Sequence, residues 1–147
     1  MRNIEDILKI KSQTNWSVEP ESTVINAMKL MKTKKASALP ALKSGKLVDV
    51  ITKTDYITKV ILKGKLPDEF QVREALTRNT IYSTPAQTVK DCLAFMTEKH
   101  LQYLPVLKEG VLVGFVSSSD FYQPIITAQK DYIYRLENYV IDTGLNQ

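Results

Sequence analysis

The sequence predicts an α/β fold in which two copies of one β-α-β-β-α unit are related by a pseudo-two-fold axis and followed by a C-terminal helix. The first observation is an internal repeat: residues 16–56 align with residues 81–121 without a gap, and 13 of the 41 positions are identical. The second is that each copy has a helical apolar stripe, a glycine turn between apolar strands and, at its end, a hydroxyl residue followed three positions later by an aspartate. We call this the hydroxyl-Asp motif; it comprises Thr52–Asp55 and Ser117–Asp120. A repeat of this length indicates one supersecondary unit that occurs twice.

The elements of the first copy follow from local signals. Thr23 is a good N-cap for a helix with apolar residues at positions i, i+3, i+4 and i+7, and Gly45 supplies the left-handed residue of a hairpin turn. Pro40 lies within a strand and must face away from a ladder partner or lie at an edge. The predicted leading helix, first strand, two hairpin strands and closing helix span residues 4–9, 15–18, 37–42, 47–52 and 55–62.

The second copy repeats this order after a linker. Pro67 opens a connecting helix, Thr88 caps the main helix, and Pro124 predicts a kink or restart after the closing motif. The connecting helix and strands are expected at residues 68–76, 80–83, 102–107 and 111–117, and the chain is divided into residues 1–65, 66–124 and 125–147. The last segment has an apolar stripe along about five helical turns: Ile125, Ile126, Tyr132, Ile133, Leu136, Tyr139 and Val140.

Composition narrows the class of protein. The chain has 147 residues, 44% of them hydrophobic and 24% charged, which is typical of a soluble domain of ordinary size. It contains no apolar stretch near 18 residues, and its first residues lack a signal-peptide core, so we expect a cytoplasmic protein. The net charge of +4 invites a nucleic-acid partner, but the lysines fall on the polar side of a helix without interleaved aromatic residues. A small anionic ligand suits this charge equally well.

The repeated motif carries the chemistry. A strand that runs into hydroxyl residues at a helix start presents free backbone N–H groups, which suit an anion such as phosphate. Ser117 and Ser119 add donors, and the carboxylate of Asp120 suits the diol of a ribose; Thr52 and Asp55 are their counterparts in the first copy. The plain alternative is that these residues are only helix caps.

Catalytic and metal-binding constellations are not evident in the sequence. One cysteine and one histidine do not make a nucleophile–base pair with an orienting third group, and Cys92 lies on an apolar helix face, where a core role is expected. No cluster with metal-ligand spacing occurs. Asp55 and Asp120 at helix starts remain ionised, which suits capping or diol binding rather than proton transfer. We therefore expect no enzymatic activity, no catalytic residue, no metal and no cofactor.

The motifs resemble a tandem pair of CBS domains. The likeness rests on Ala38-Leu39-Pro40-Ala41 and Tyr103-Leu104-Pro105-Val106 before the hairpins and on the hydroxyl-Asp motifs after them, and it covers essentially the whole chain. The end of the chain, at residues 136–140, resembles that of small stand-alone bacterial CBS-pair proteins. The first repeat also looks like one repeat of the gamma subunit of AMP-activated protein kinase.

The resemblance implies two clefts between the repeats that bind adenosine-containing ligands, with the motif Asp on the ribose, the motif hydroxyls and loop amides on phosphate, and the base in a slot beside the Leu-Pro strand. Site one then consists of Gln13, Thr14, Asn15, Trp16, Ser37, Ala38, Ser117, Ser119 and Asp120. Site two consists of Thr52, Lys53, Thr54, Asp55, Arg78, Asn79, Thr80, Ile81, Gln102 and Tyr103.

Three departures qualify these expectations. Asp49 replaces the motif glycine and brings a negative charge near site two. Tyr103 either fills that cleft or stacks on a base. Site one has no lysine in its motif, so it is expected to neutralise a triphosphate poorly, whereas Lys53 and Arg78 make site two the better phosphate pocket.

The sequence therefore predicts a non-enzymatic regulatory or sensor module that binds an adenine nucleotide, AMP-like by preference, with ADP, ATP, NAD and S-adenosylmethionine as further candidates. The alternative is a structural or protein-interaction module with degenerate clefts. The C-terminal stripe predicts a homodimer, although this helix also has the option of folding back on its own chain. An unidentified protein partner is expected to receive the signal, with no nucleic acid and no membrane involved.

Overall fold

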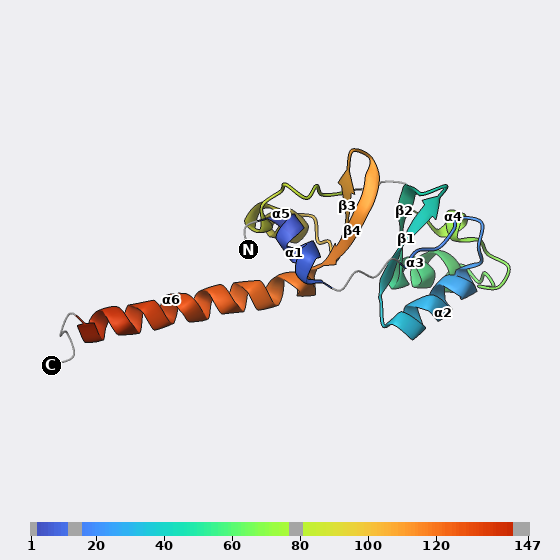
Figure 1. The fold of residues 1–147 in the computed structure, drawn as a ribbon. Helices are drawn as coiled ribbons and strands as arrows, with labels where there is room; N and C mark the ends of the chain where they lie inside the picture. The colour runs from blue at the N-terminus through green and yellow to red at the C-terminus, as the bar shows by residue number, and fades with distance from the viewer. Residues whose placement is uncertain (1–2, 12–15, 77–80, 143–147) are drawn as a thin grey trace.

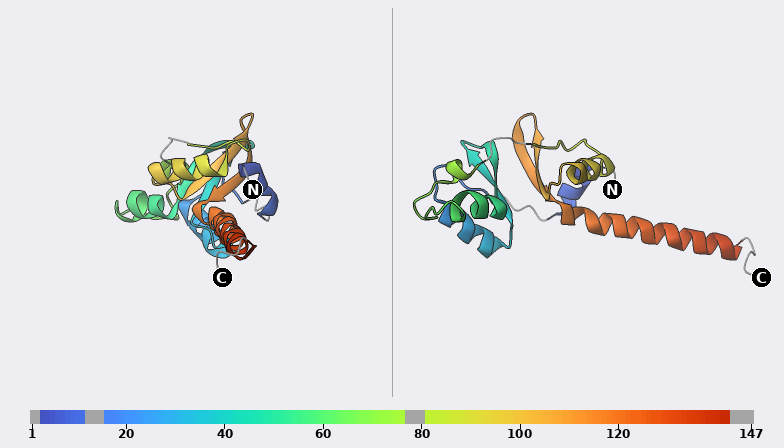
Figure 2. Two further views of the ribbon diagram at one scale, coloured as in Figure 1. Left: turned by 90° about the vertical axis from the view of Figure 1, so that its left-hand side faces the viewer. Right: turned by 180° about the vertical axis from the view of Figure 1, so that it is seen from behind.

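The computed structural model describes residues 3–11, 16–76 and 81–142 and shows two similar halves with the hairpins between them (Figure 1). Strands β1 (Ala38–Lys43) and β2 (Lys46–Thr52) form one antiparallel hairpin, and β3 (Tyr103–Lys108) and β4 (Val111–Ser117) form the other. The two hairpins lie near the middle of the molecule, and the helices cover their outer sides, as the view from behind also shows (Figure 2). The predicted mixed α/β repeat pair is confirmed.

The hairpins match their sequence signals closely. Ser44 and Gly45 both adopt left-handed φ values, of 51° and 77°, and Glu109 and Gly110 do the same in the second copy. The predicted first strands are reduced to single parallel bridges, from Val18 to Ala41 and from Ser83 to Val106. Pro40 fits into strand β1 because its position needs only a hydrogen-bond acceptor toward Val18. The Pro40 carbonyl accepts from the Val18 N–H at 3.0 Å.

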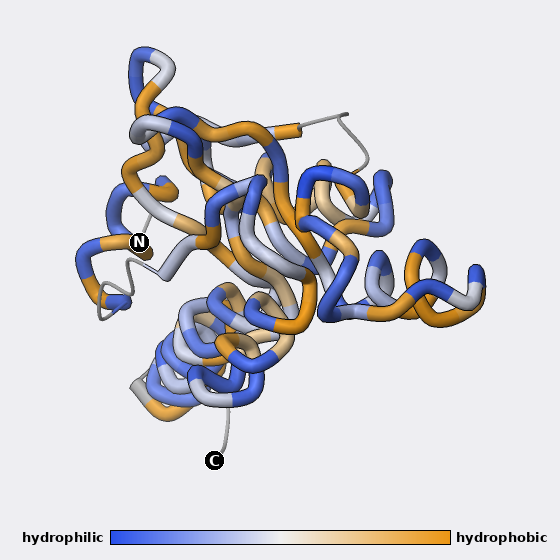
Figure 3. Tube along the Cα trace, turned by 90° about the vertical axis from the view of Figure 1, so that its right-hand side faces the viewer, coloured by the Kyte–Doolittle hydropathy of each residue, from blue (hydrophilic) through white to orange (hydrophobic). Residues whose placement is uncertain are grey.

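The main helices α2 (Val24–Lys34) and α5 (Val89–Glu98) begin at their predicted caps, Thr23 and Thr88. Each threonine hydroxyl accepts from a backbone N–H three residues later, at 3.3 Å in the first copy and 3.0 Å in the second. Their apolar stripes are buried: Met31 and Met96 are each 1% exposed. Figure 3 shows how hydrophobic stretches along the trace alternate with hydrophilic turns.

The closing helices differ from expectation in detail. In the first copy, α3 (Lys53–Tyr56) begins before Asp55 and continues as a π-helical turn, η1 (Ile57–Ile61). In the second copy, η2 (Ser118–Phe121) is a 3-10 turn that is followed by the long helix α6 (Tyr122–Asp142). The expected restart is therefore confirmed, and it occurs at Tyr122. Pro124 lies in the first turn of α6, where a missing N–H costs nothing.

Each leading helix packs on the half formed by the other repeat. Helix α1 (Ile4–Ile10) contributes to the core beneath α5, whereas α4 (Val72–Ala75) contributes to the core beneath α2. The anchors are equivalent: the N–H groups of Ile4 and Glu5 bond the carbonyls of Gln87 and Pro85, and those of Val72 and Arg73 bond Ser22 and Pro20. The packing units in space therefore differ from the segments 1–65 and 66–124, which remain a division of the sequence.

Gly114 marks the closest approach of α1 to the second hairpin. A Cβ atom at this position would lie 2.4 Å from Leu8 Cδ2 and 2.9 Å from Leu8 Cδ1, so the glycine makes room for the Leu8 side chain. The equivalent position in the first hairpin is Asp49, which pairs with Ala41 in the β1–β2 ladder. The requirement for glycine is thus local to the α1 contact.

We expect Gly114→Ala to destabilise the fold by about 1–3 kcal/mol, because the added methyl group overpacks the contact with Leu8. Leu8→Ala removes the clashing atoms, so the double variant should be more stable than the sum of the two single losses predicts, with a coupling of about 1 kcal/mol or more. Urea denaturation of the four proteins measures this coupling. Strictly additive losses would show that Leu8 is not what restricts position 114.

Candidate functional site

The hydroxyl-Asp motifs lie at the ends of the two hairpins, where β2 and β4 run into a helical turn. Thr52 is the N-cap of α3: its hydroxyl accepts from the Asp55 N–H at 3.0 Å, and its own N–H donates to Asp55 Oδ2 at 2.9 Å. In the second copy the Ser117 N–H donates to Asp120 Oδ2 at 2.7 Å. Both aspartates therefore act as helix-capping residues, as the plain interpretation of the sequence anticipated.

Each motif aspartate also pairs with a lysine. The Lys11 ammonium group lies 2.8 Å from Asp120 Oδ2 and donates to the Phe115 carbonyl at 2.7 Å. The Lys59 ammonium group lies 3.3 Å from Asp55 Oδ1 and donates to the Ala75 carbonyl at 3.0 Å. The aspartate side chains are only 20% and 15% exposed, so these pairs are partly shielded from water. A ribose role for either carboxylate remains a prediction.

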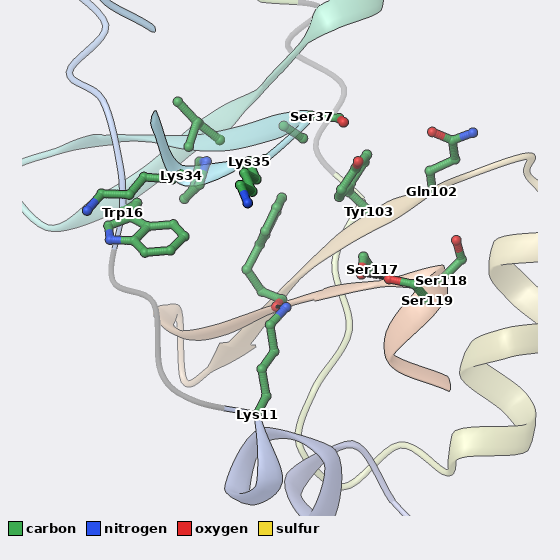
Figure 4. A pocket seen from close by; sticks show the side chains of 15 residues that line it. Lys11, Trp16, Lys34, Lys35, Ser37, Gln102, Tyr103, Ser117, Ser118 and Ser119 are labelled. Atoms are coloured by element: carbon green, nitrogen blue, oxygen red, sulfur yellow. Dashed lines mark hydrogen bonds between the residues drawn. The ribbon is translucent and has the colours of Figure 1, made fainter. Parts of the chain in front are cut away.

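The first cavity, cavity one, lies between the two halves and has a volume of about 470 Å³ (Figure 4). Five predicted site-one residues line it: Trp16, Ser37, Ala38, Ser117 and Ser119. Asp120 does not line it, because its carboxylate bonds Lys11 and the motif backbone. Gln13, Thr14 and Asn15 lie outside the described residues.

Three lysines from outside the motif line cavity one: Lys11 after α1, Lys34 at the end of α2 and Lys35 at its C-cap. Figure 4 shows Lys34 beside Trp16 and Lys11 entering from the opposite side. The Lys34 ammonium group lies 4.9 Å from the Trp16 ring centroid, a cation–π distance. Spatial neighbours therefore bring to this site positive charge that the motif lacks. How well the site neutralises a triphosphate stays a prediction.

Lys35 differs from the other two lysines in its freedom to meet a ligand. Lys11 is bound to Asp120, and Lys34 lies over Trp16, but the Lys35 ammonium group has no bond or ion pair with any residue that the structure describes. Its backbone has a φ of 54°, the left-handed conformation that ends α2. Only Ala36 and Ser37 separate this C-cap position from β1. Its equivalent in the second copy is His100, which also has a positive φ.

The second cavity, cavity two, has a volume of about 590 Å³ and shares some of its lining residues with cavity one. Six predicted site-two residues line it: Thr52, Lys53, Thr54, Ile81, Gln102 and Tyr103. Asp55 does not line it, and Arg78, Asn79 and Thr80 lie outside the described residues. Asp49 and His100 also line the cavity, and Asp49 is 6% exposed. The expected acidic residue thus lies beside site two, and among the described lining residues cavity one has the more positive set.

Three residues line both cavities: Ser37, Gln102 and Tyr103. The Ser37 carbonyl accepts from the Lys53 N–H at 3.0 Å, and the Gln102 carbonyl accepts from the Ser118 N–H at 2.9 Å. Tyr103 stacks on Phe115 with the ring centroids 6.0 Å apart and the rings 10° from parallel. The Tyr103 ring is therefore part of the wall that separates the cavities. Ser37 is bonded to a residue that lines cavity two, whereas Gln102 and Tyr103 contact residues that line cavity one.

The environment of Cys92 disfavours a role as a nucleophile. Cys92 is fully buried in the core beneath α5, and desolvation there raises the pKa of its thiol, which keeps it protonated and unreactive. Within the described residues, no group of three or more His, Cys, Asp or Glu side chains is placed to hold a metal ion. No described helix combines the length and the apolar character needed to cross a bilayer.

Comparison with known proteins gives consistent matches. A family model of the CBS domain matches residues 4–61 and 72–126. The mitochondrial CBS domain-containing protein CBSX3 of Arabidopsis thaliana is 27% identical over 93% of this chain and 71% of its own length. A CBS-domain protein from Burkholderia ambifaria is 32% identical, covering 86% of this chain and 96% of that chain with a TM-score of 0.81. The hexameric CBS-CP12 protein from bloom-forming cyanobacteria shares the fold at 24% identity, covering 82% and 66% with a TM-score of 0.71.

Proposed function

This chain belongs to the CBS-domain family, a family of regulatory modules that often bind adenosine ligands, and on that premise we propose that it is a non-enzymatic sensor of an adenine nucleotide. The observation that carries the proposal is cavity one. It combines aromatic walls with three lysines and four serines between the repeats. Its occupation is expected to change the contacts between the two halves and thereby the affinity for a protein partner.

The lining of cavity one suits the parts of a nucleotide. Trp16, Tyr103 and Phe115 offer apolar and aromatic surface for a purine, and Ala38 is small enough to leave a slot beside them. Ser117 and Ser119, together with the lysines, supply donors for phosphate. AMP is the simplest ligand that has both a purine for the aromatic surface and a phosphate for the donors. The number of lysines also suits the additional charge of ADP or ATP, whereas S-adenosylmethionine, a cation, gains nothing from them.

We expect Lys35→Glu to weaken nucleotide binding in cavity one by roughly 10- to 100-fold, because it replaces a cation available to phosphate by an anion. Lys29→Glu is the matched control: it makes the same change of charge on an exposed position of the same helix, outside the lining of both cavities. Titration calorimetry with AMP and ATP compares the two variants. Equal affinities would show that binding depends on net charge alone and would remove Lys35 from the site.

The alternative function is a structural or protein-interaction module with degenerate clefts. The capping bonds and the lysine pairs of Asp55 and Asp120 favour it, because they give both carboxylates a structural role that needs no ligand. The two functions differ in thermal stability, since a ligand that binds only the folded state raises the melting temperature. Millimolar adenine nucleotides without any thermal shift would favour the alternative.

We further propose that the chain forms a homodimer. The support is the apolar face of α6, on which Tyr132, Ile133 and Leu136 are 64%, 54% and 46% exposed. Figure 1 shows this helix extending away from both halves rather than folding back over them. Covering large apolar side chains at about 25 cal/mol per Å² favours association. The hexameric state of the CBS-CP12 protein shows that one protein of this fold does assemble.

A further inference from the structure

Helix α6 has an apolar face that is largely exposed among the residues that the structure describes: Ile126, Ile133 and Leu136 are 44%, 54% and 46% exposed. With 21 residues it is about 30 Å long, and it contacts the second half only near its start, where Ile125 packs against the core (Figures 1 and 2). The apolar residues recur at alternating intervals of three and four: Tyr122, Ile126, then Ile133, Leu136 and Val140, with Gln129 between them. This spacing is typical of helices that pair along their length.

The charges beside this apolar face distinguish between two ways of pairing. Lys130 and Glu137 are seven residues apart, so both border the face along the edge next to Ile126 and Ile133. The opposite edge is formed by Tyr132 and Tyr139. Both charged residues are exposed.

In an antiparallel pair of identical helices, like edges meet, and Lys130 then lies opposite Glu137 of the partner subunit. The reciprocal contact follows from symmetry, so the pair contains two opposite-charge contacts centred between residues 133 and 134. In a parallel pair, unlike edges meet, and the charged edge faces the tyrosine edge instead. Charge complementarity therefore selects the antiparallel arrangement.

We propose that α6 pairs antiparallel with α6 of a second copy of this chain, with Lys130 and Glu137 fixing direction and register. The proposal rests on the homodimer and specifies its interface. A groove of about 760 Å³ beside Ile125, lined by Val89 and Leu93 among others, continues the apolar face onto α5. In the antiparallel register this groove lies next to the end of the partner's α6, so the interface extends onto the second half.

The test uses charge reversals in the full chain, with dimer affinity measured by sedimentation equilibrium. Lys130→Glu and Glu137→Lys each turn both contacts into repulsions and should each weaken the dimer roughly 5- to 10-fold. The double variant Lys130→Glu/Glu137→Lys keeps the net charge and should recover the wild-type affinity. An equimolar mixture of the two single variants should form heterodimers of near wild-type affinity. Asp131→Lys, on the opposite helix face, is the control and should change little.

Two results would overturn this interface. If the single variants match Asp131→Lys, or if the double variant stays weak, the antiparallel register is wrong although the homodimer stands. If the wild-type chain is monomeric at about 100 µM, both the homodimer and this interface are wrong. Nucleotide titration of the same variants keeps these outcomes apart from failure of the sensor function, because Lys130 and Glu137 line neither cavity.

Discussion

Replacing Ser37 by tryptophan is expected to abolish nucleotide binding in both cavities at once. Ser37 lines both cavities and is half-buried at the wall between them, so one large side chain there occupies space on either side. We expect the affinity for AMP and ATP to fall by about 100-fold or more, because ligand sites of this size rely on an open apolar slot. Titration calorimetry on the folded variant measures the loss.

Thr33→Trp is a suitable control for this change. It places the same side chain at an exposed position near the end of α2, outside the lining of both cavities. Far-ultraviolet circular dichroism and the melting temperature establish that both variants remain folded. Full retention of affinity in folded Ser37→Trp would place the ligand elsewhere. Loss of affinity in both variants would indicate a general effect of tryptophan near this helix end.

Phe121→Ala should be the most destabilising single truncation in the second half. Phe121 is the largest of the fully buried side chains, and it packs in the core with α1 and α5. Deleting a buried phenylalanine ring costs about 3–5 kcal/mol through lost burial and the cavity that remains. For a chain of this size we expect the melting temperature to fall by roughly 10 °C.

The repeat provides an internal control for this loss. Tyr56 occupies the equivalent position in the first half but is only partly buried, so Tyr56→Ala should cost clearly less. Urea denaturation of the two variants gives the comparison. Equal losses would contradict the burial difference between the halves. A Phe121→Ala variant as stable as the wild-type chain would contradict the packing of the second core.

Local sequence signals predicted the elements of the fold well. Thr23 and Thr88 cap the helices as expected, and the left-handed Gly45 and Gly110 close the hairpins, because these features depend on neighbouring residues only. The packing of α1 against the second half, and of α4 against the first, was not predicted. The internal alignment begins at residue 16 and therefore contains no information on where α1 packs. A possible signal was Gly114, which stands where the first copy has Asp49 and leaves room for Leu8.

In the candidate site, too, local features were predicted from the sequence and features that depend on tertiary packing were not. Ser117 was predicted from the motif, and Trp16 and Ser37 were implied by the resemblance to CBS pairs; all three line cavity one. The lysines of this cavity were missed, because Lys11 and Lys34 reach it from helices whose placement depends on tertiary packing. Lys35 was within reach of sequence reasoning: a lysine directly after a helix and just before the Leu-Pro strand lies near the predicted slot. The helix-capping role of both aspartates follows from the motif spacing alone.

Titration calorimetry of the full wild-type chain with AMP, ADP, ATP, NAD and S-adenosylmethionine shows whether the clefts between the repeats bind an adenine nucleotide. We expect saturable binding of the adenine nucleotides, with loss of the cavity-one site in Lys35→Glu and not in Lys29→Glu. The absence of any heat of binding from all five ligands at millimolar concentration would contradict nucleotide binding by these clefts.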